Sequence, residues 1–324
     1  MQLISLLKET SAYKTVVSDK SADRLSHAYL VVSSDAKMLG EYLKIFAKLI
    51  LSDGGLNDIR TERLIDGGAH PDVLTFPRSG ESVLKEDVAA IIEESFYKPI
   101  ESDKKIFLIL NGESMNASSQ NKLLKTLEEP PKGVHIIIGA TSEYPLLSTV
   151  KSRVKKLVIP PFDKEKLFDA LVCDYPDEEK LKQSIACGDG TVGTALALYK
   201  DEYLSDTVAL CEDVFINMKS SRSVLEFSNR IAGLKDGVKG FISVLNTLCR
   251  DYMLYLNGEE SAVFNKSALE RIKTAEGFNK GAIVYILGKI LEAEKRLSAN
   301  VNPQAAIERL LFDFLEGKHK WQKL

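Results

Sequence analysis

The chain has 324 residues, of which 44% are hydrophobic and 27% are charged, and its formal net charge is −3. These values are ordinary for a globular protein, and the length is enough for two or three domains with at least one sizeable core. The small negative charge argues against a protein whose overall field draws it to nucleic acid or to an anionic membrane.

The cysteines and the N-terminal residues indicate a reducing compartment. The four cysteines are scattered, with no CxxC pair and no histidine at metal-ligand spacing: Cys173, Cys187, Cys211 and Cys249. We therefore expect reduced thiols within the core and no metal site. The N-terminus lacks the apolar segment of a signal peptide, and no apolar run reaches the roughly 18 residues of a membrane span. The sequence predicts a cytoplasmic protein with no membrane partner.

Short apolar runs alternate with helical patterns over the first 160 residues. The runs that we expect to be strands are residues 28–33, 72–76, 105–110, 134–138 and 156–159. Helical spacing of apolar residues predicts a helix over 38–51 and another from residue 84 to near Pro99. Strands that alternate with helices indicate a parallel sheet with helices on both faces, an α/β fold.

A further helix is expected from about residue 117 to residue 129, with Asn116 as its N-cap and a proline pair as its stop. Its leucines Leu123, Leu124 and Leu127 are expected to face a core. After Pro160–Pro161 the pattern is helical throughout, and residues 318–323 are expected to form a solvated tail. We predict an α/β domain over 1–162, a small helical domain over 163–205 and a helical domain over 206–324.

The loop after the first strand lacks the features of a phosphate-binding loop. Such loops need glycines whose backbone N–H groups converge on phosphate, a lysine, and a serine or threonine for Mg²⁺. Residues 33–40 (SSDAKMLG) contain no glycine before Gly40 and no Gly-Lys-Ser/Thr sequence. Asp35 would repel phosphate, and Lys37 is the one candidate cation; the sequence leaves open whether Lys37 supports residual nucleotide binding.

The third strand also lacks the carboxylate pair that holds Mg²⁺ in nucleotide-hydrolysing sheets, because it ends in Leu110 and Asn111. Glu113 lies beyond the strand end and is expected to be a solvated turn carboxylate. Two independent losses predict that the domain neither binds nor hydrolyses ATP in the usual way and needs no cofactor.

Several segments resemble the delta-prime subunits of the bacterial DNA polymerase III clamp loader. They are RLSHAYL (24–30), HPDV (70–73), MNASSQNKLLKTLEEPP (115–131), LLSTVKSRV (146–154) and NVNPQAAIERLL (300–311). The LLKTLEEPP stretch is shared with the ATP-hydrolysing gamma/tau subunits of the same family. The degenerate phosphate loop favours the delta-prime type over an active gamma/tau-like ATPase, which stays the alternative.

The resemblance implies an AAA+ architecture: a RecA-like α/β domain, a helical lid and a helical C-terminal collar that oligomerises. It implies a non-hydrolysing stator in a hetero-oligomer with delta and gamma/tau subunits, which loads the sliding clamp onto primed DNA during DNA replication. It also implies that the chain is a subunit of the polymerase holoenzyme but neither a polymerase nor an active ATPase itself. Arg153 matches the residue that such a subunit supplies in trans to the neighbour's ATP site as an arginine finger. Arginine suits this role because its planar, permanently charged fork can contact two phosphate oxygens.

The chain departs from the family pattern at several positions. Val154 replaces the usual cysteine after the arginine, and we expect no effect on Arg153. Residues 52–69 contain no cysteine where many members carry a zinc module, so we predict no zinc. Thr141 occupies the position of a polar sensor, and hydrolysing relatives place an arginine where this chain has Gly193 or Thr194.

Two other functions would leave different signatures. An active ATPase would bind nucleotide as an isolated chain. A stand-alone DNA-binding module would bind DNA in a salt-sensitive way, which the acidic net charge argues against. Without the resemblance, Arg153 would be an ordinary surface arginine in a basic cluster with Lys151, Lys155 and Lys156.

Overall fold

The computed structural model describes residues 3–51, 59–80, 82–234, 237–263, 265–299 and 301–320. Its α/β part is built on one sheet of five parallel strands in the order β2-β3-β4-β1-β5. The strands are β1 (Ala28–Ser33), β2 (Val73–Phe76), β3 (Lys105–Ile109), β4 (Val134–Ala140) and β5 (Lys155–Ile159). All five expected strands are confirmed. Every residue of β3 and β4 is buried, as both faces of a central parallel strand require.

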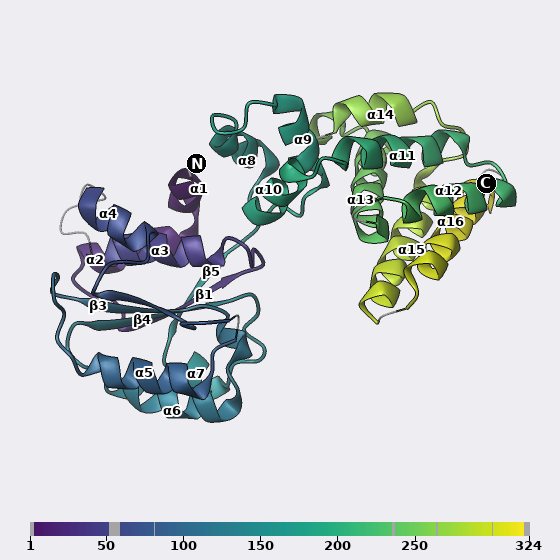
Figure 1. The fold of residues 1–324 in the computed structure, drawn as a ribbon. Coiled ribbons are helices and arrows are strands. Elements are labelled where there is room, and N and C mark those ends of the chain that lie inside the picture. The colour runs from purple at the N-terminus through teal and green to yellow at the C-terminus, as the bar shows by residue number, and fades with distance from the viewer. Residues whose placement is uncertain are drawn as a thin grey trace. The chain divides into compact units, whose positions relative to one another are not determined.

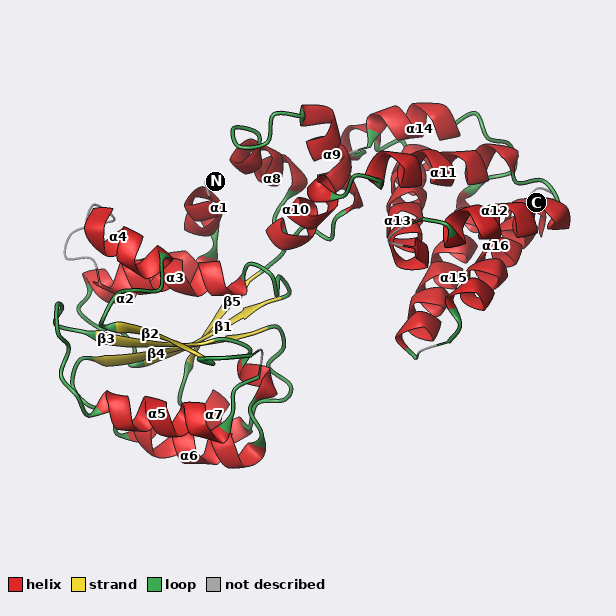
Figure 2. Cartoon of the chain, in the orientation of Figure 1, coloured by secondary structure: helices red, strands yellow, loops and turns green. Residues whose placement is uncertain are grey.

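Helices cover both faces of this sheet (Figures 1 and 2). One layer holds α2 (Ser11–Ser21), α3 (Leu39–Leu51) and α4 (Ile59–Asp66), preceded by α1 (Leu3–Glu9). The other layer holds α5 (Lys85–Ser95), α6 (Ala117–Glu128) and α7 (Ser148–Lys151), with the short 3-10 helix η1 (Gly112–Ser114) before α6. Helix α3 packs closely on β4, because a Cβ atom at Gly139 would lie 2.9 Å from Leu43 Cδ1. The α/β class is therefore confirmed.

The characteristic helix α6 forms as its sequence predicts. The Asn116 side chain caps it by accepting a hydrogen bond from the Ser119 N–H at 2.9 Å. Leu123 and Leu127 are fully buried in the core beneath the sheet, while Leu124 is partly buried against the same core. The interaction of one helix face with the sheet thus stabilises α6.

The described residues that follow Ile159 form helices and loops without a strand. The helices are α8 (Lys164–Leu171), α9 (Glu178–Cys187), α10 (Val192–Lys200), α11 (Leu204–Asn217), α12 (Ser221–Ala232), α13 (Gly237–Leu256), the 3-10 helix η2 (Glu260–Ala262), α14 (Lys266–Ile272), α15 (Lys280–Ser298) and α16 (Pro303–Lys320). The chain forms two compact units: residues 1–171 with 191–193, and residues 172–190 with 194–324. The three-part division at 162 and 205 stays a prediction.

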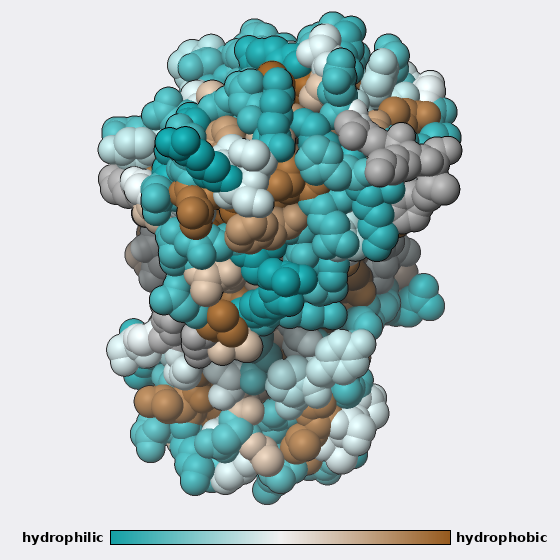
Figure 3. Space-filling model, turned by 90° about the vertical axis from the view of Figure 1, so that its right-hand side faces the viewer, coloured by the Kyte–Doolittle hydropathy of each residue, from teal (hydrophilic) through white to brown (hydrophobic). Residues whose placement is uncertain are grey.

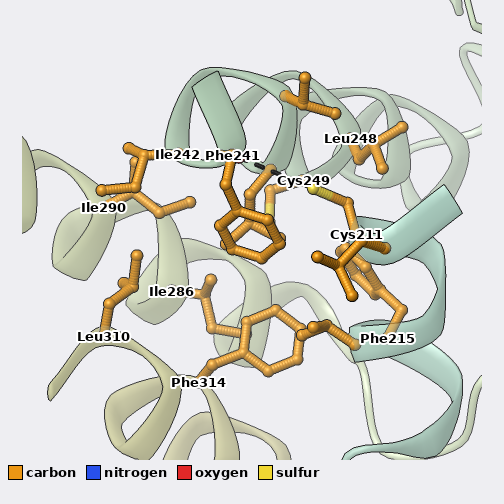
Figure 4. Packing of buried hydrophobic residues seen from close by; sticks show 14 of the residues in the cluster. Cys211, Phe215, Phe241, Ile242, Leu248, Cys249, Ile286, Ile290, Leu310 and Phe314 are labelled. Atoms are coloured by element: carbon orange, nitrogen blue, oxygen red, sulfur yellow. Dashed lines mark hydrogen bonds between the residues drawn. The ribbon is translucent and has the colours of Figure 1, made fainter. Parts of the chain in front are cut away.

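A hydrophobic cluster of aliphatic side chains and aromatic rings forms the core of the second unit (Figure 4). The rings of Phe215 and Phe314 meet edge to face with their centroids 5.1 Å apart. Cys211 and Cys249 are fully buried there, and burial raises the pKa of both thiols, which keeps them protonated and unreactive. Cys187 is buried as well, but Cys173 is exposed, so the expectation of four core thiols is wrong for Cys173.

The expected solvated tail is also wrong at its first residue. Helix α16 extends to Lys320, and Lys318 is only 5% exposed. Its amine donates hydrogen bonds to the carbonyl oxygens of Phe215 and Met218, at the C-terminal end of α11. Carbonyls at a helix end lack partners within the helix, so a buried cation is favourable there. Residues 321–323 of the expected tail lie outside the described residues.

The face of the molecule in Figure 3 is mostly hydrophilic, with hydrophobic side chains in small separate groups. Such scattered groups are usual on globular proteins. No helix among the described residues is both long enough and apolar enough to cross a membrane.

The HPDV segment (70–73) contains a buried carboxylate, that of Asp72. Asp72 is fully buried, and its oxygens accept hydrogen bonds from the N–H groups of Ile100 (2.6 Å), Glu101 (2.8 Å) and Ser102 (2.8 Å). The His70 ring in turn accepts a hydrogen bond from the Asp72 N–H. Burial acts to raise the pKa of Asp72, but the hydrogen bonds outweigh burial, and the pKa is lowered. Asp72 therefore fixes the loop that leads into β3.

We expect Asp72→Asn to lower the free energy of unfolding by about 2 kcal/mol or more, because an amide cannot accept at both positions. Since the folded-state pKa is depressed, the contribution of Asp72 is present above the unfolded value of about 3.9 and is lost as pH falls through the folded pKa. Urea unfolding at neutral and acidic pH measures both effects. The control Asp103→Asn removes an exposed charge from the same loop, and an equal loss in both variants would contradict the role of Asp72.

Candidate functional site

The strand register assigns the candidate residues to opposite edges of the sheet. Lys155 of β5 pairs with Tyr29 near the start of β1, so Arg153 lies at the edge where β1 begins. Asp35 follows Ser33, the last residue of β1, and lies at the opposite edge. Five steps along β1, at roughly 3.3 Å each, separate the two edges by about 16 Å. Arg153 therefore lies far from the phosphate-loop position of its own chain.

The Arg153 guanidinium is held by neighbours from two elements. Its Nη1 donates hydrogen bonds to the Thr149 carbonyl (2.9 Å) and to Ser152 Oγ (3.1 Å) at the end of α7. Its Nη2 lies 2.6 Å from Oε1 of Glu128, the last residue of α6. The side chain still has 34% of its surface exposed. The site thus presents an oriented arginine that another molecule can reach.

Glu128 is a partner of Arg153 that sequence reasoning missed. The signal was present, because the LEEPP segment and the Ser-Arg segment are both characteristic of the resemblance. Nothing in the sequence, however, says that the two segments meet in space. The ion pair is exposed on both sides, so solvent screens it and a competing anion can displace Glu128.

Gln120 connects the two segments that meet at Arg153. It is 1% exposed, and its Nε2 donates to the carbonyl oxygens of Met115 (2.9 Å) and Pro145 (3.2 Å). Its Oε1 accepts from the Leu147 N–H at 2.7 Å, directly before α7. A buried amide with these three bonds fixes α7 against α6 and so orients the turn that carries Arg153.

Two of the lysines in the expected basic cluster are paired with carboxylates. Lys155 lies 2.7 Å from Asp19, and Lys156 lies 2.7 Å from Glu143. The hydrogen bond from Lys156 lowers the pKa of Glu143. These pairs compensate much of the positive charge around Arg153, which argues against an extended basic surface there.

The loop between β1 and α3 contains a buried carboxylate. Asp35 is 4% exposed, and its Oδ1 accepts a hydrogen bond from the Met38 N–H (3.2 Å), at the start of α3. Its Oδ2 accepts from the Tyr42 hydroxyl at 3.0 Å. Burial raises the pKa of Tyr42, with the charge of Asp35 adding to the effect, so the phenol stays protonated as a donor. Lys37 is exposed.

Gly193 lies against this carboxylate. Its N–H donates to Asp35 Oδ2 at 2.9 Å. A Cβ atom at Gly193 would lie 2.3 Å from Asp35 Oδ1 and 2.7 Å from Lys37 Cβ. No side chain fits at position 193 in this arrangement.

The end of β3 is followed by Leu110 and Asn111, where the sequence has no carboxylate pair. A Cβ atom at Gly40 would lie 3.7 Å from Leu110 Cδ2, so an aliphatic side chain lies beside the start of α3. Asn111 has φ 52° and ψ 47°, a left-handed conformation that asparagine tolerates better than most residues. The chain therefore turns at Asn111, two residues after β3 ends.

Glu113 is not the solvated turn carboxylate that we expected. Its Oε1 accepts hydrogen bonds from the Thr141 N–H at 2.9 Å and from the Thr141 hydroxyl. Thr141 follows β4, so this bond ties the end of β4 to the turn after β3. Parallel strands bring their carboxyl ends to one edge, which is why two distant residues meet.

Among the residues that the structure describes, no three histidine, cysteine, aspartate or glutamate side chains come together as a metal site. The expectation of no zinc module concerns residues 52–69, of which 52–58 lie outside the described residues. That expectation stays a prediction.

A family model described as "DNA polymerase III, delta subunit" matches residues 8–163. DNA polymerase III subunit delta' of Bacillus subtilis is 25% identical over 314 residues, covering 94% of this chain and 95% of that protein. Subunit delta' of Escherichia coli is 22% identical, covering 64% of this chain and 65% of that protein.

Gamma and tau subunits are similar as well. Subunit tau of Bacillus subtilis is 24% identical and covers 96% of this chain but 56% of that protein. Among solved structures, a gamma subunit-related protein of Thermotoga maritima matches 91% of this chain and 95% of that chain, with 20% identity and a TM-score of 0.45.

Removing either partner of the Arg153–Glu128 pair should hardly affect folding. We expect Arg153→Ala and Glu128→Gln each to lower the free energy of unfolding by less than about 1 kcal/mol, because the pair is exposed. Thermal and urea unfolding measure this, with Glu129→Gln as a control that removes the adjacent charge. A loss above about 2 kcal/mol would mean that the pair is structural.

Proposed function

We propose that this chain, which belongs to the family of DNA polymerase III clamp-loader subunits, is a delta-prime-type subunit that does not hydrolyse ATP. Its relatives in that family are named delta', gamma and tau. Three features of the α/β part support this assignment. The loop after β1 has no Gly-Lys-Ser/Thr sequence, β3 is followed by Leu110 and Asn111 and not by a carboxylate pair, and either Gly193 or Thr194 stands where hydrolysing relatives place an arginine. The loss of all three leaves no usual arrangement for Mg²⁺ and γ-phosphate.

We further propose that Arg153 acts in trans at the ATP site of a neighbouring gamma/tau subunit. The observation that carries this proposal is the separation of Arg153 from its own phosphate-loop position by the length of β1. An arginine at the opposite edge of the sheet serves a nucleotide only if another chain brings that nucleotide to it. There the guanidinium would stabilise the negative charge that develops on the γ-phosphate oxygens. Glu128 would hold Arg153 oriented until the phosphate displaces it.

The remaining assignments follow from the same role. The proposed partners are delta and gamma/tau subunits, with the sliding clamp and primed DNA engaged through the assembled complex. Residues 206–324 are the proposed oligomerising collar, and residues 163–205 the proposed lid. We propose a cytoplasmic location, because the relatives are subunits of a DNA polymerase and bacterial DNA lies in the cytoplasm.

The arginine role predicts a specific catalytic defect. In the assembled complex, Arg153→Ala should slow single-turnover ATP hydrolysis at the neighbouring site on the order of 10³-fold, the lower range for an arginine supplied in trans. Arg153→Lys should recover little of this rate, because lysine keeps the charge but lacks the planar fork.

The matched control is Lys151→Ala, which removes a charge from the same turn without touching the proposed role. Subunit assembly, followed by size-exclusion chromatography, should be the same for all variants. If the Arg153→Ala complex hydrolyses ATP and loads clamps at the wild-type rate, the arginine role is wrong.

Co-assembly tests the partner assignment separately. We expect the wild-type chain to form a stoichiometric complex when mixed with delta and gamma/tau subunits, measured by analytical ultracentrifugation. The chain alone should bind no ATP in equilibrium dialysis, whereas an active gamma/tau-like ATPase would bind it. Failure to co-assemble would refute the delta-prime assignment, and saturable ATP binding would favour the alternative.

A further inference from the structure

The loop after β1 holds an anion that belongs to the chain itself. Both oxygens of Asp35 are used: Oδ1 accepts from the Met38 N–H, and Oδ2 accepts from the Tyr42 hydroxyl and the Gly193 N–H. The Asp35 N–H also donates to Ser33 Oγ at 3.2 Å. A carboxylate with these partners, at 4% exposure, is held inside the protein and not at its surface.

This arrangement repeats the chemistry of phosphate binding with different atoms. A phosphate loop directs backbone N–H groups at the start of a helix toward an anion. Here the N–H of Met38, the residue directly before the 13-residue helix α3, is directed toward a carboxylate. The Gly193 N–H is a second backbone donor to the same carboxylate. A charged hydrogen bond to a backbone amide is stronger than a neutral one.

The contact binds a segment that is remote in sequence. Thr191, Val192 and Gly193 belong to the first compact unit, although the residues on either side of them belong to the second. Thr191 and Val192 are buried. The Asp35–Gly193 hydrogen bond therefore joins two segments that lie 158 positions apart in the chain.

We propose that Asp35 is a resident anion that takes the place of nucleotide phosphate and holds residues 191–193 on the loop after β1 without any ligand. In a nucleotide-dependent protein such a contact would form and break with the bound phosphate. Here the anion is covalently part of the chain, so the contact is present whether or not a phosphate is bound. This inference extends the non-hydrolysing role proposed above, but the existence of the Asp35–Gly193 contact does not depend on that role. Asp35 both fills the space that phosphate would need and repels phosphate by its charge.

Backbone amide hydrogen exchange on the full-length chain tests the proposal. In the wild-type protein the Gly193 amide should exchange at least about 100-fold more slowly than an unprotected amide, as expected of a buried hydrogen bond. The rates at Gly193 and Met38 should stay unchanged when ATP and Mg²⁺ are added. An unprotected Gly193 amide in the wild-type protein would overturn the proposal without any variant.

The variant Asp35→Asn keeps the shape of the side chain but removes its charge and one acceptor. We expect it to speed exchange at Gly193 at least about tenfold, while amides in β3 keep their wild-type rates. Asp103→Asn is the control, because it removes a carboxylate from the loop before β3 and should leave Gly193 unchanged. Equal exchange at Gly193 in wild type and Asp35→Asn, or slower exchange on addition of ATP, would overturn the proposal.

These measurements are made on the chain alone, so they do not depend on the test of Arg153. A normal clamp-loading rate in Arg153→Ala would leave the Asp35 contact standing. An unprotected Gly193 amide would leave the arginine role standing.

Discussion

The parallel pairing of β1 with β4 and β5 is the constraint on which the functional assignment depends. Parallel strands direct all their carboxyl ends to one edge of a sheet and all their amino ends to the other. The loop with Asp35, the Leu110–Asn111 turn and Thr141 follow strand ends and share the carboxyl edge. Arg153 precedes β5 and lies at the amino edge. Arg153 and the loop after β1 therefore lie at opposite edges of one sheet, and Arg153 cannot reach that loop.

Buried polar side chains then fix the loops on which these residues lie. Asp72 accepts hydrogen bonds from three backbone N–H groups in the loop before β3. Gln120 connects α6 to the start of α7 by hydrogen bonds, and Asp35 connects the loop after β1 to Gly193. Each is almost completely buried and has its hydrogen bonds made. Since a buried polar group without a partner is destabilising, these residues define one arrangement of the loops. Lys318 acts in the same way at the end of α11.

Much of the fold could be predicted because hydrophobic periodicity reports local structure. The five strands, the Asn116 cap and the burial of Leu123 and Leu127 all follow from patterns within about a dozen residues. The errors fall where partners are distant in sequence. Glu113 was expected in solvent but binds Thr141, and Lys318 was expected in solvent but binds the end of α11. A local pattern carries no information about a partner that only folding brings near.

The sequence by itself determined the class of fold, the absence of a Gly-Lys-Ser/Thr loop, and the resemblance that singles out Arg153. These three conclusions depend only on residue types and on their spacing along the chain, and both can be read from the sequence. Only the tertiary structure decided that Glu128 holds Arg153, that Asp35 meets Gly193, and that Arg153 and Asp35 lie at opposite edges of one sheet. The reason is physical. Glu128 and Arg153 are 25 positions apart in the chain, and Asp35 and Gly193 are 158 positions apart. Their places in space follow from strand order, register and packing, which no local sequence pattern specifies.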